Sequence, residues 1–190
     1  MSVTDELVLY SYWRSSASYR VRLALALKSL PHRIEPIHLT EGGGQQHEVN
    51  YRSLNPQGLV PTLIHGDRVL TQSLAIIEYI DEQFPQTPLL PNSAEGRAKV
   101  RALSLVIASD IAPLANLRVL NRLSETCKAG DDDRQAWAKY WIQMGLEAFE
   151  QSLSTIHPNP ERAQFCWGNE PSMADCCLLP QVYNAQRFGC

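Results

Sequence analysis

The feature that most constrains the fold of this 190-residue chain is a change in hydrophobic period at a proline-rich segment, residues 85–92. Before this segment, short apolar runs of strand length alternate with stretches of helical period. After it, every apolar pattern has the helical period. Pro85, Pro88 and Pro91 stiffen the joint, so we expect a linker there. The sequence therefore predicts a mixed α/β domain over residues 1–84 and an all-helical domain over residues 93–190.

The first part has the element order β-α-β followed by β-β-α, which predicts a mixed sheet with helices packed on it. Its second strand contains Pro36, which suits the edge of a sheet. The Gly66-Asp67 pair between two apolar runs indicates a hairpin. The elements that we expect are strand 7–12, a helix from Ser15, strand 32–39, a short helix over 47–53, strand 59–65, strand 68–70 and a helix from Ser73 to Phe84.

The second part contains three helical patterns. The first covers residues 98–123 and is interrupted or kinked at Pro113. The second begins at the aspartates 131–133, whose charges oppose the helix dipole favourably. The third follows a capping box at Ser172 and Asp175, and Cys176 and Cys177 are expected in its core. The expected buried face of the second helix is Trp137, Tyr140, Trp141, Met144, Leu146, Phe149 and Leu153.

The helix that begins after Ser15 follows an apolar strand and a turn rich in serine. Hydroxyls at a helix start accept the first free backbone N–H groups, and the start carries partial positive charge. This geometry suits a bound anion, although an ordinary capped helix has the same signature. Apolar residues at helical spacing predict a buried face of Tyr19, Leu23, Ala26, Leu27 and Leu30. On this reading of the helix, three long side chains can stay in water, namely Arg20, Arg22 and Lys28.

Composition excludes several classes of function. A net charge of -3 provides no basic field for nucleic acid or for an anionic membrane. No apolar run has membrane-spanning length, and the first residues lack the pattern of a signal peptide, so we expect a cytoplasmic protein. The five cysteines have no regular spacing, which fits a reducing compartment. The five histidines lack metal-ligand spacing, so no metal site is expected.

Several segments, taken together and in order, resemble the zeta class of glutathione transferases and, within it, the maleylacetoacetate isomerases. They are Ser15–Arg22, Leu54–Pro56, Leu59–Leu63, Gln72–Tyr79 and Met173–Ala185. The resemblance covers nearly the whole chain. It implies a thioredoxin-like α/β domain that binds glutathione, an all-α domain that carries part of the substrate site, and usually a homodimer.

The resemblance also assigns the parts of a glutathione site. The Val60-Pro61 bond matches the cis-proline turn whose backbone pairs with the cysteinyl part of glutathione. Gln72 and Ser73 match the pair that holds the γ-glutamyl carboxylate, and Ser73 is also expected to cap a helix. Gln45 or Gln46 matches the position that reaches the glycyl end. Ordinary turn and cap chemistry is the alternative for each residue taken alone.

The implied reaction is a cis-to-trans isomerisation of maleylacetoacetate, in the breakdown of tyrosine and phenylalanine. Ser15 or Ser16 would stabilise the glutathione thiolate, which adds to a conjugated carbon. Negative charge on the substrate needs a cation, for which Arg14 is the first candidate and Arg118, with Asn116 beside it, the second. For either arginine, a surface or interdomain position is the alternative.

The chain departs from the class at three places. Ala17 stands where the class usually has cysteine, and Ala112 where relatives commonly have glutamine or histidine. The chain ends at Cys190, where class members continue with a further helix, so we expect exposed apolar surface there or a shortened form of a longer protein. Because of these departures, two alternative functions remain open. One is a zeta-like glutathione transferase or maleylpyruvate isomerase that acts on another small acid, and the other is a non-catalytic glutathione-binding module.

Overall fold

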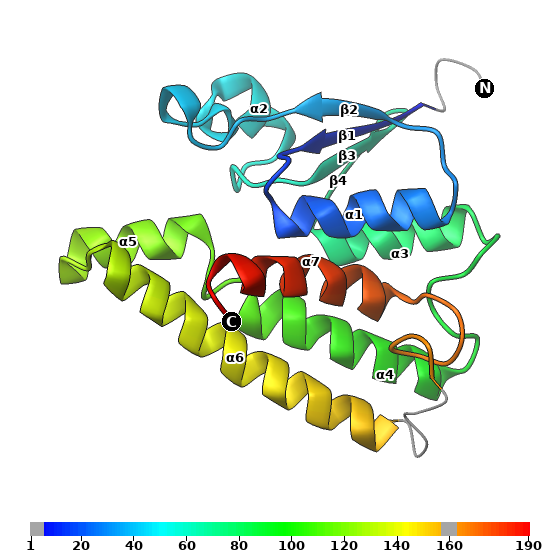
Figure 1. Cartoon of the computed structure of the whole chain (residues 1–190). Coiled ribbons are helices and arrows are strands. Elements are labelled where there is room, and N and C mark those ends of the chain that lie inside the picture. Colours follow the sequence, from blue (N-terminus) through cyan, green and yellow to red (C-terminus); the bar gives the residue numbers. More distant parts are fainter. Residues whose placement is uncertain (1–5, 157–162) are drawn as a thin grey trace. The chain divides into compact units, whose positions relative to one another are not determined.

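The computed structural model describes residues 6–156 and 163–190 and divides into two compact units, Met1–Leu89 and Leu90–Cys190. The first unit is a four-stranded mixed sheet of strand order β2-β1-β3-β4, with α1 packed beside α3 (Figure 1). This confirms the expected thioredoxin-like architecture. Its elements are β1 (Leu7–Ser11), α1 (Ser16–Leu27), β2 (Arg33–Pro36), η2 (Glu41–Gly43), η3 (Gln45–His47), α2 (Val49–Leu54), β3 (Thr62–His65), β4 (Arg68–Thr71) and α3 (Ser73–Gln83).

The register of the strands brings four chain segments to one end of this sheet. β1 runs parallel to β2, with Ser11 opposite Pro36. β3 runs antiparallel to both of its neighbours, with Thr62 opposite Tyr10 of β1 and opposite Thr71 of β4. The last residues of β1, β2 and β4 and the first residue of β3 therefore lie at the same end, which we call the Ser11 end. As expected, the strand that contains Pro36 lies at an edge of the sheet.

The buried face of α1 differs from the expected one. Its buried residues are Ser18, Arg20, Val21, Ala24 and Leu25. The prediction of a buried Ala26 and Leu27 is wrong, because both are exposed. Small and large apolar residues occur on all sides of this helix, so periodicity alone does not select one face.

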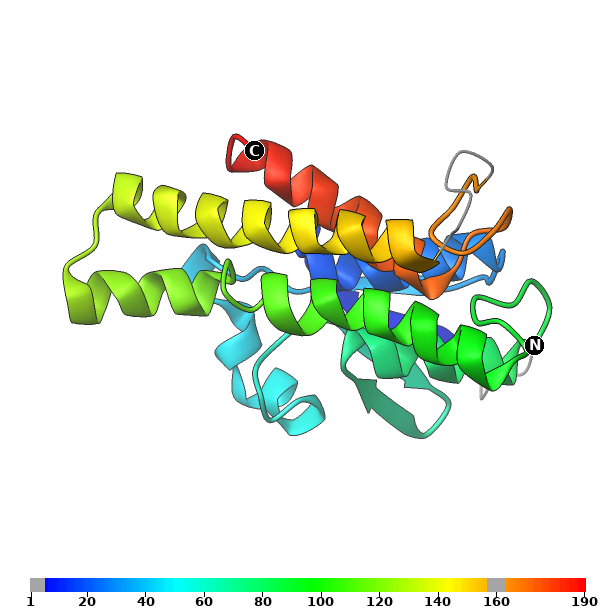
Figure 2. The ribbon, with the colours of Figure 1, turned by 90° about the horizontal axis from the view of Figure 1, so that it is seen from below.

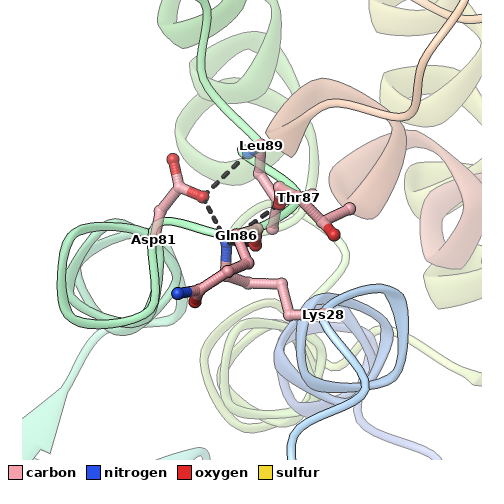
Figure 3. A network of polar contacts seen from close by, with 5 residues as sticks. All are labelled: Lys28, Asp81, Gln86, Thr87 and Leu89. Atoms are coloured by element: carbon pink, nitrogen blue, oxygen red, sulfur yellow. Dashed lines mark hydrogen bonds and ion pairs between the residues drawn. The ribbon is translucent and has the colours of Figure 1, made fainter.

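The prediction that Arg20 and Lys28 remain in water is also wrong, because each is buried with polar partners. Lys28 Nζ lies 2.8 Å from Asp81 Oδ1 of α3 and donates hydrogen bonds to the backbone oxygens of Gln86 (3.1 Å) and Thr87 (2.9 Å) (Figure 3). Asp81 Oδ1 also accepts the Leu89 N–H at 2.8 Å. An ammonium group has three donors, and here three acceptors surround it. Residues 86–89, part of the expected linker, are thereby fixed to α1 and α3.

The second unit is all-helical, as expected. α4 packs against both α6 and α7, and Figure 2 shows α6 running alongside α4. The break expected at Pro113 occurs, since the helical run stops at Ile111 and resumes at Leu117. The segment before the break, η4, is π-helical. The elements are α4 (Ala94–Leu105), η4 (Val106–Ile111), α5 (Leu117–Cys127), α6 (Asp131–Ile156) and α7 (Met173–Arg187).

Single residues explain how α7 begins and why α6 can approach η4 closely. The expected capping box at the start of α7 is present, with the Ser172 N–H and hydroxyl both donating to Asp175 Oδ2, at 2.8 and 2.7 Å. Cys176 and Cys177 are buried, as predicted. Gly145 lets α6 approach η4 closely, because a Cβ at this position would overlap the Ile111 side chain.

The buried face of α6 is only partly as expected. Phe149 is buried, but Tyr140 is 59% exposed and Met144 is 44% exposed, so these two predictions are wrong. The other fully buried side chains are those of Ala138 and Ile142. Two residues turn a helix by about 200°, so Tyr140 and Met144 point almost opposite to them. Across the part of the chain that the structure describes, no helix has the length and apolarity needed to cross a bilayer.

Candidate functional site

The Ser11 end of the sheet gathers the residues that the sequence assigned to a glutathione site in the first unit. The chain leaves β1 at Ser11 and turns into α1 through residues 12–15. The Val60-Pro61 bond lies directly before β3, and Gln72 lies directly after β4. Because the strand register aligns these ends, segments that are up to about sixty residues apart in sequence form one end of the unit.

The start of α1 presents free hydrogen-bond donors. Ser15 is the N-cap, and its Oγ accepts the Ser18 N–H at 3.2 Å, which confirms the expected helix start. Among the described residues, the amides of Ser16 and Ala17 have no acceptor. Since Ser15 Oγ acts as an acceptor, its own proton is available for a further hydrogen bond. Two backbone amides and two half-buried hydroxyls therefore lie at the positive end of the helix.

Arg22, which the sequence analysis expected in water, holds the turn before α1. Its Nη1 donates to Ser11 Oγ at 2.8 Å and to the Tyr12 oxygen at 3.3 Å, and its Nη2 donates to the Trp13 oxygen at 3.2 Å. Burial lowers the pKa of Arg22 from its ordinary value. Arg14 is exposed, and its guanidinium carbon lies 5.4 Å from the centre of the Trp13 ring. Through Arg22, α1 therefore stabilises the turn that leads to Ser15, the N-cap of the same helix.

The Val60-Pro61 peptide bond is cis, as the resemblance implies. The preceding Leu59 carbonyl accepts the hydroxyl of Tyr51 at 2.6 Å and the side-chain amide of Asn55 at 2.8 Å. Burial raises the pKa of Tyr51, which keeps the phenol in its donating form. Among the described residues, the N–H and C=O of Val60 form no backbone hydrogen bond, so both can pair with a ligand.

The start of α3 differs from the expected cap. Gln72, and not Ser73, is the N-cap, and its side chain forms no capping hydrogen bond. Its φ of 69° lies in the left-handed region, which is uncommon for glutamine. Gln72 Nε2 donates to Gln57 Oε1 at 2.9 Å. Ser73 Oγ instead accepts a hydrogen bond from Arg20 Nη1 at 3.2 Å, and both residues are buried.

Gln45 and Gln46 differ in their burial and in their hydrogen bonds. Gln46 is buried, and its Nε2 lies 3.1 Å from the Leu39 oxygen and 3.1 Å from His47 Nε2, so it holds its own loop together. Gln45 is exposed, and its Oε1 accepts the His38 N–H at 2.7 Å. This hydrogen bond uses the oxygen of the Gln45 side chain and leaves its NH₂ group available to a ligand.

The candidate substrate residues Asn116 and Arg118 lie in the second unit, at the start of α5. Asn116 is the N-cap, and its side-chain oxygen accepts the Arg118 N–H at 3.2 Å. Both residues are exposed. Ala112 follows η4 and donates its N–H to the Ile107 oxygen at 2.9 Å. The roles of these residues toward a substrate remain predictions.

The groups at the Ser11 end have the chemistry that suits a bound anion. It offers backbone amides at two helix starts, hydroxyl groups and side-chain amides. Within residues 6–156 and 163–190, no three histidine, cysteine, aspartate or glutamate side chains cluster as metal ligands would. The supporting roles of Arg20, Arg22 and Tyr51 were not predicted from the sequence. The only signal for the two arginines was their place in the Arg-Val-Arg segment of the class.

Comparison with known proteins shows the family to which the chain belongs. Residues 9–88 match the family model described as glutathione S-transferase, N-terminal domain. The maleylacetoacetate isomerase of Rhizobium meliloti is 48% identical over 187 residues, which cover 98% of this chain and 84% of that protein. The solved holo structure of a maleylpyruvate isomerase, described as a bacterial zeta-class glutathione S-transferase, is 42% identical with a TM-score of 0.90, covering 96% of this chain and 84% of that one.

A further relative has been solved with ligands. The maleylacetoacetate isomerase of Anaeromyxobacter dehalogenans, with glutathione bound in its active site, is 39% identical and has a TM-score of 0.82. It covers 98% of this chain and 84% of its own. The same protein, at 37% identity and a TM-score of 0.80 in that structure, with the same coverage, was also solved with dicarboxyethyl glutathione and citrate in the active site.

Proposed function

Because the chain belongs to the zeta class of the glutathione S-transferase family, we propose that it is a glutathione-dependent isomerase that converts maleylacetoacetate to fumarylacetoacetate. The observation that carries this proposal is the Ser11 end of the sheet. There the start of α1, the cis Val60-Pro61 bond and the start of α3 offer the hydrogen-bonding groups that glutathione requires. Such a reaction belongs to the breakdown of tyrosine and phenylalanine.

Glutathione would lie across this end of the sheet. The free N–H and C=O of Val60 would pair with its cysteinyl backbone, and the amides and side chains at Gln72 and Ser73 would hold the γ-glutamyl carboxylate. Gln45, with its side-chain NH₂ available, would reach the glycyl carboxylate. The buried Gln46 would support the loop. With these contacts, the cysteinyl sulfur would lie toward the start of α1.

Ser15 and Ser16 would then hold the sulfur as a thiolate. A hydrogen bond to a charged group contributes about 1.5–3 kcal/mol, and a helix terminus adds about 0.3–1 kcal/mol. At about 1.36 kcal/mol per pKa unit, these effects lower the pKa of the thiol by about one to three units from a reference near 8.5. The thiolate is then populated at neutral pH. The serine hydroxyl stabilises the anion and does not act as a nucleophile.

The isomerisation follows from reversible addition of this thiolate. The sulfur forms a bond to a conjugated alkene carbon, and the π electrons move to the carbonyl oxygen to give an enolate. The former double bond is now single and rotates. The enolate then re-forms the double bond in the trans geometry and expels the thiolate. Arg14 would stabilise the enolate or a substrate carboxylate, and Arg118 with Asn116 is the second candidate.

A maleylpyruvate isomerase is the second candidate function, because a relative with that name is 42% identical to this chain. We expect purified protein with glutathione to isomerise maleylacetoacetate, and a parallel assay with maleylpyruvate and haloacids to rank the alternatives. Omitting glutathione is the control and should abolish turnover. A protein that binds glutathione but turns over none of these acids would instead be the non-catalytic module that Ala17 and Ala112 leave open.

The γ-glutamyl contacts give a binding test. Replacing Gln72 and Ser73 together with alanine should weaken glutathione binding about tenfold, because hydrogen bonds to the carboxylate are lost while the amides at the start of α3 remain. Titration calorimetry measures the change, and the exposed Ser53→Ala variant is the matched control. Unchanged affinity in the double variant would place the γ-glutamyl group elsewhere.

We also propose a cytoplasmic homodimer, the usual state of the class. Sedimentation should then give about twice the 21.3 kDa mass of the chain. A mass equal to that of one chain would contradict the dimer.

A further inference from the structure

We propose that Arg20 is a positioning residue that makes the site selective for a ligand with a free γ-glutamyl α-carboxylate. This inference rests on the proposed function, since it deepens the role given to Ser73. Arg20 lies on α1 and Ser73 is the first residue of α3, so one hydrogen bond joins the two packed helices across 53 positions of sequence.

The geometry fixes how Ser73 can interact. Arg20 Nη1 lies 3.2 Å from Ser73 Oγ, and the two residues are 3% and 6% exposed. A guanidinium group has donors but no acceptor, so Ser73 Oγ must be the acceptor in this bond. The hydroxyl proton of Ser73 is therefore left to point toward another acceptor. A carboxylate at the start of α3 is the acceptor that fits such a proton.

The charge of Arg20 also favours a carboxylate at the start of α3. A guanidinium remains protonated, and interactions of a buried charge are screened by water much less than those of an exposed one. Its positive charge adds to the partial positive charge of the backbone amides at the start of α3. Arg20 thus both orients the Ser73 hydroxyl and raises the positive potential where the γ-glutamyl carboxylate would lie. It supports the ligand through Ser73 and is not a catalytic residue.

The test compares two peptides that differ only in this carboxylate. Calorimetry on the full chain would use glutathione and 4-aminobutanoyl-cysteinyl-glycine, which lacks the α-carboxylate. We expect Arg20→Met to weaken glutathione binding about tenfold and to leave the analogue within about twofold of its wild-type affinity. Arg68→Met, at an exposed arginine of β4 in the same unit, is the matched control and should change neither affinity.

Two further variants keep the test decisive if Arg20→Met does not fold. Arg20→Lys keeps a charged donor and should retain part of the selectivity between the peptides, whereas Arg20→Gln keeps a donor without the charge and should lose most of it. An equal loss for both peptides, or an unchanged glutathione affinity, would overturn the role of Arg20 alone. Failure of the wild-type protein to bind glutathione would instead overturn the proposed function.

Discussion

Replacing both Ser15 and Ser16 with alanine is expected to lower kcat/KM for the glutathione-dependent isomerisation about 100-fold. The double variant removes both hydroxyls that can donate to the sulfur, and a hydrogen bond to a charged group contributes about 1.5–3 kcal/mol. The free amides of Ser16 and Ala17 remain in the variant, so part of the thiolate stabilisation should persist. Steady-state kinetics at saturating glutathione measures the change.

The single variants separate catalysis from helix capping. Ser15→Ala also removes the acceptor of the Ser18 N–H, so we expect a loss of about 1 kcal/mol in the free energy of unfolding. Ser16 is not the cap, so Ser16→Ala should leave stability nearly unchanged. Ser53→Ala, at an exposed serine of α2, is the control for both measurements. Wild-type kinetics in the double variant would show that neither hydroxyl activates the sulfur.

The Lys28→Met variant is expected to lose about 3–5 kcal/mol of unfolding free energy, because it removes one partner of the buried Lys28–Asp81 ion pair. The Lys28 and Asp81 side chains are 0% and 7% exposed, so water screens this pair poorly (Figure 3). Two backbone oxygens, those of Gln86 and Thr87, also lose their donor. Urea denaturation followed by circular dichroism gives the change in free energy.

A second substitution tests whether removal of the Lys28 cation from beside the Asp81 carboxylate causes this loss. Asp81→Asn in the Lys28→Met background removes the charge but keeps an oxygen for the Leu89 N–H, so it should recover part of the stability. Lys99→Met, which breaks the exposed pair with Glu95 on α4, is the control and should have little effect. The account of this network fails if Lys28→Met and Lys99→Met have equal effects on stability.

Much of the fold could be predicted from local patterns. The apolar run before Ser15, the strand containing Pro36 and the hairpin at Gly66 each carry a short-range signal, and the structure confirms all three. The Pro113 break and the Ser172 capping box are local in the same sense. These features depend on backbone preferences and neighbouring residues, which a single sequence contains.

The buried polar pairs that support the first unit could not be predicted, because the two members of each pair are distant in sequence. Arg20 and Ser73 are 53 positions apart, as are Lys28 and Asp81, and nothing in α1 alone shows that these cations are buried. The left-handed backbone conformation of Gln72 likewise depends on the turn between β4 and α3. The local sequence does not show this conformation, and for that reason Ser73 was predicted as the N-cap.

The most direct measurement of the central claim is an ultraviolet difference titration of glutathione bound to the wild-type protein. The account predicts that the bound thiol ionises with an apparent pKa about one to three units below that of free glutathione. It also predicts that the Ser15→Ala/Ser16→Ala variant loses most of this shift. A bound thiol that titrates like the free one, or a full shift that persists without both hydroxyls, would contradict the account.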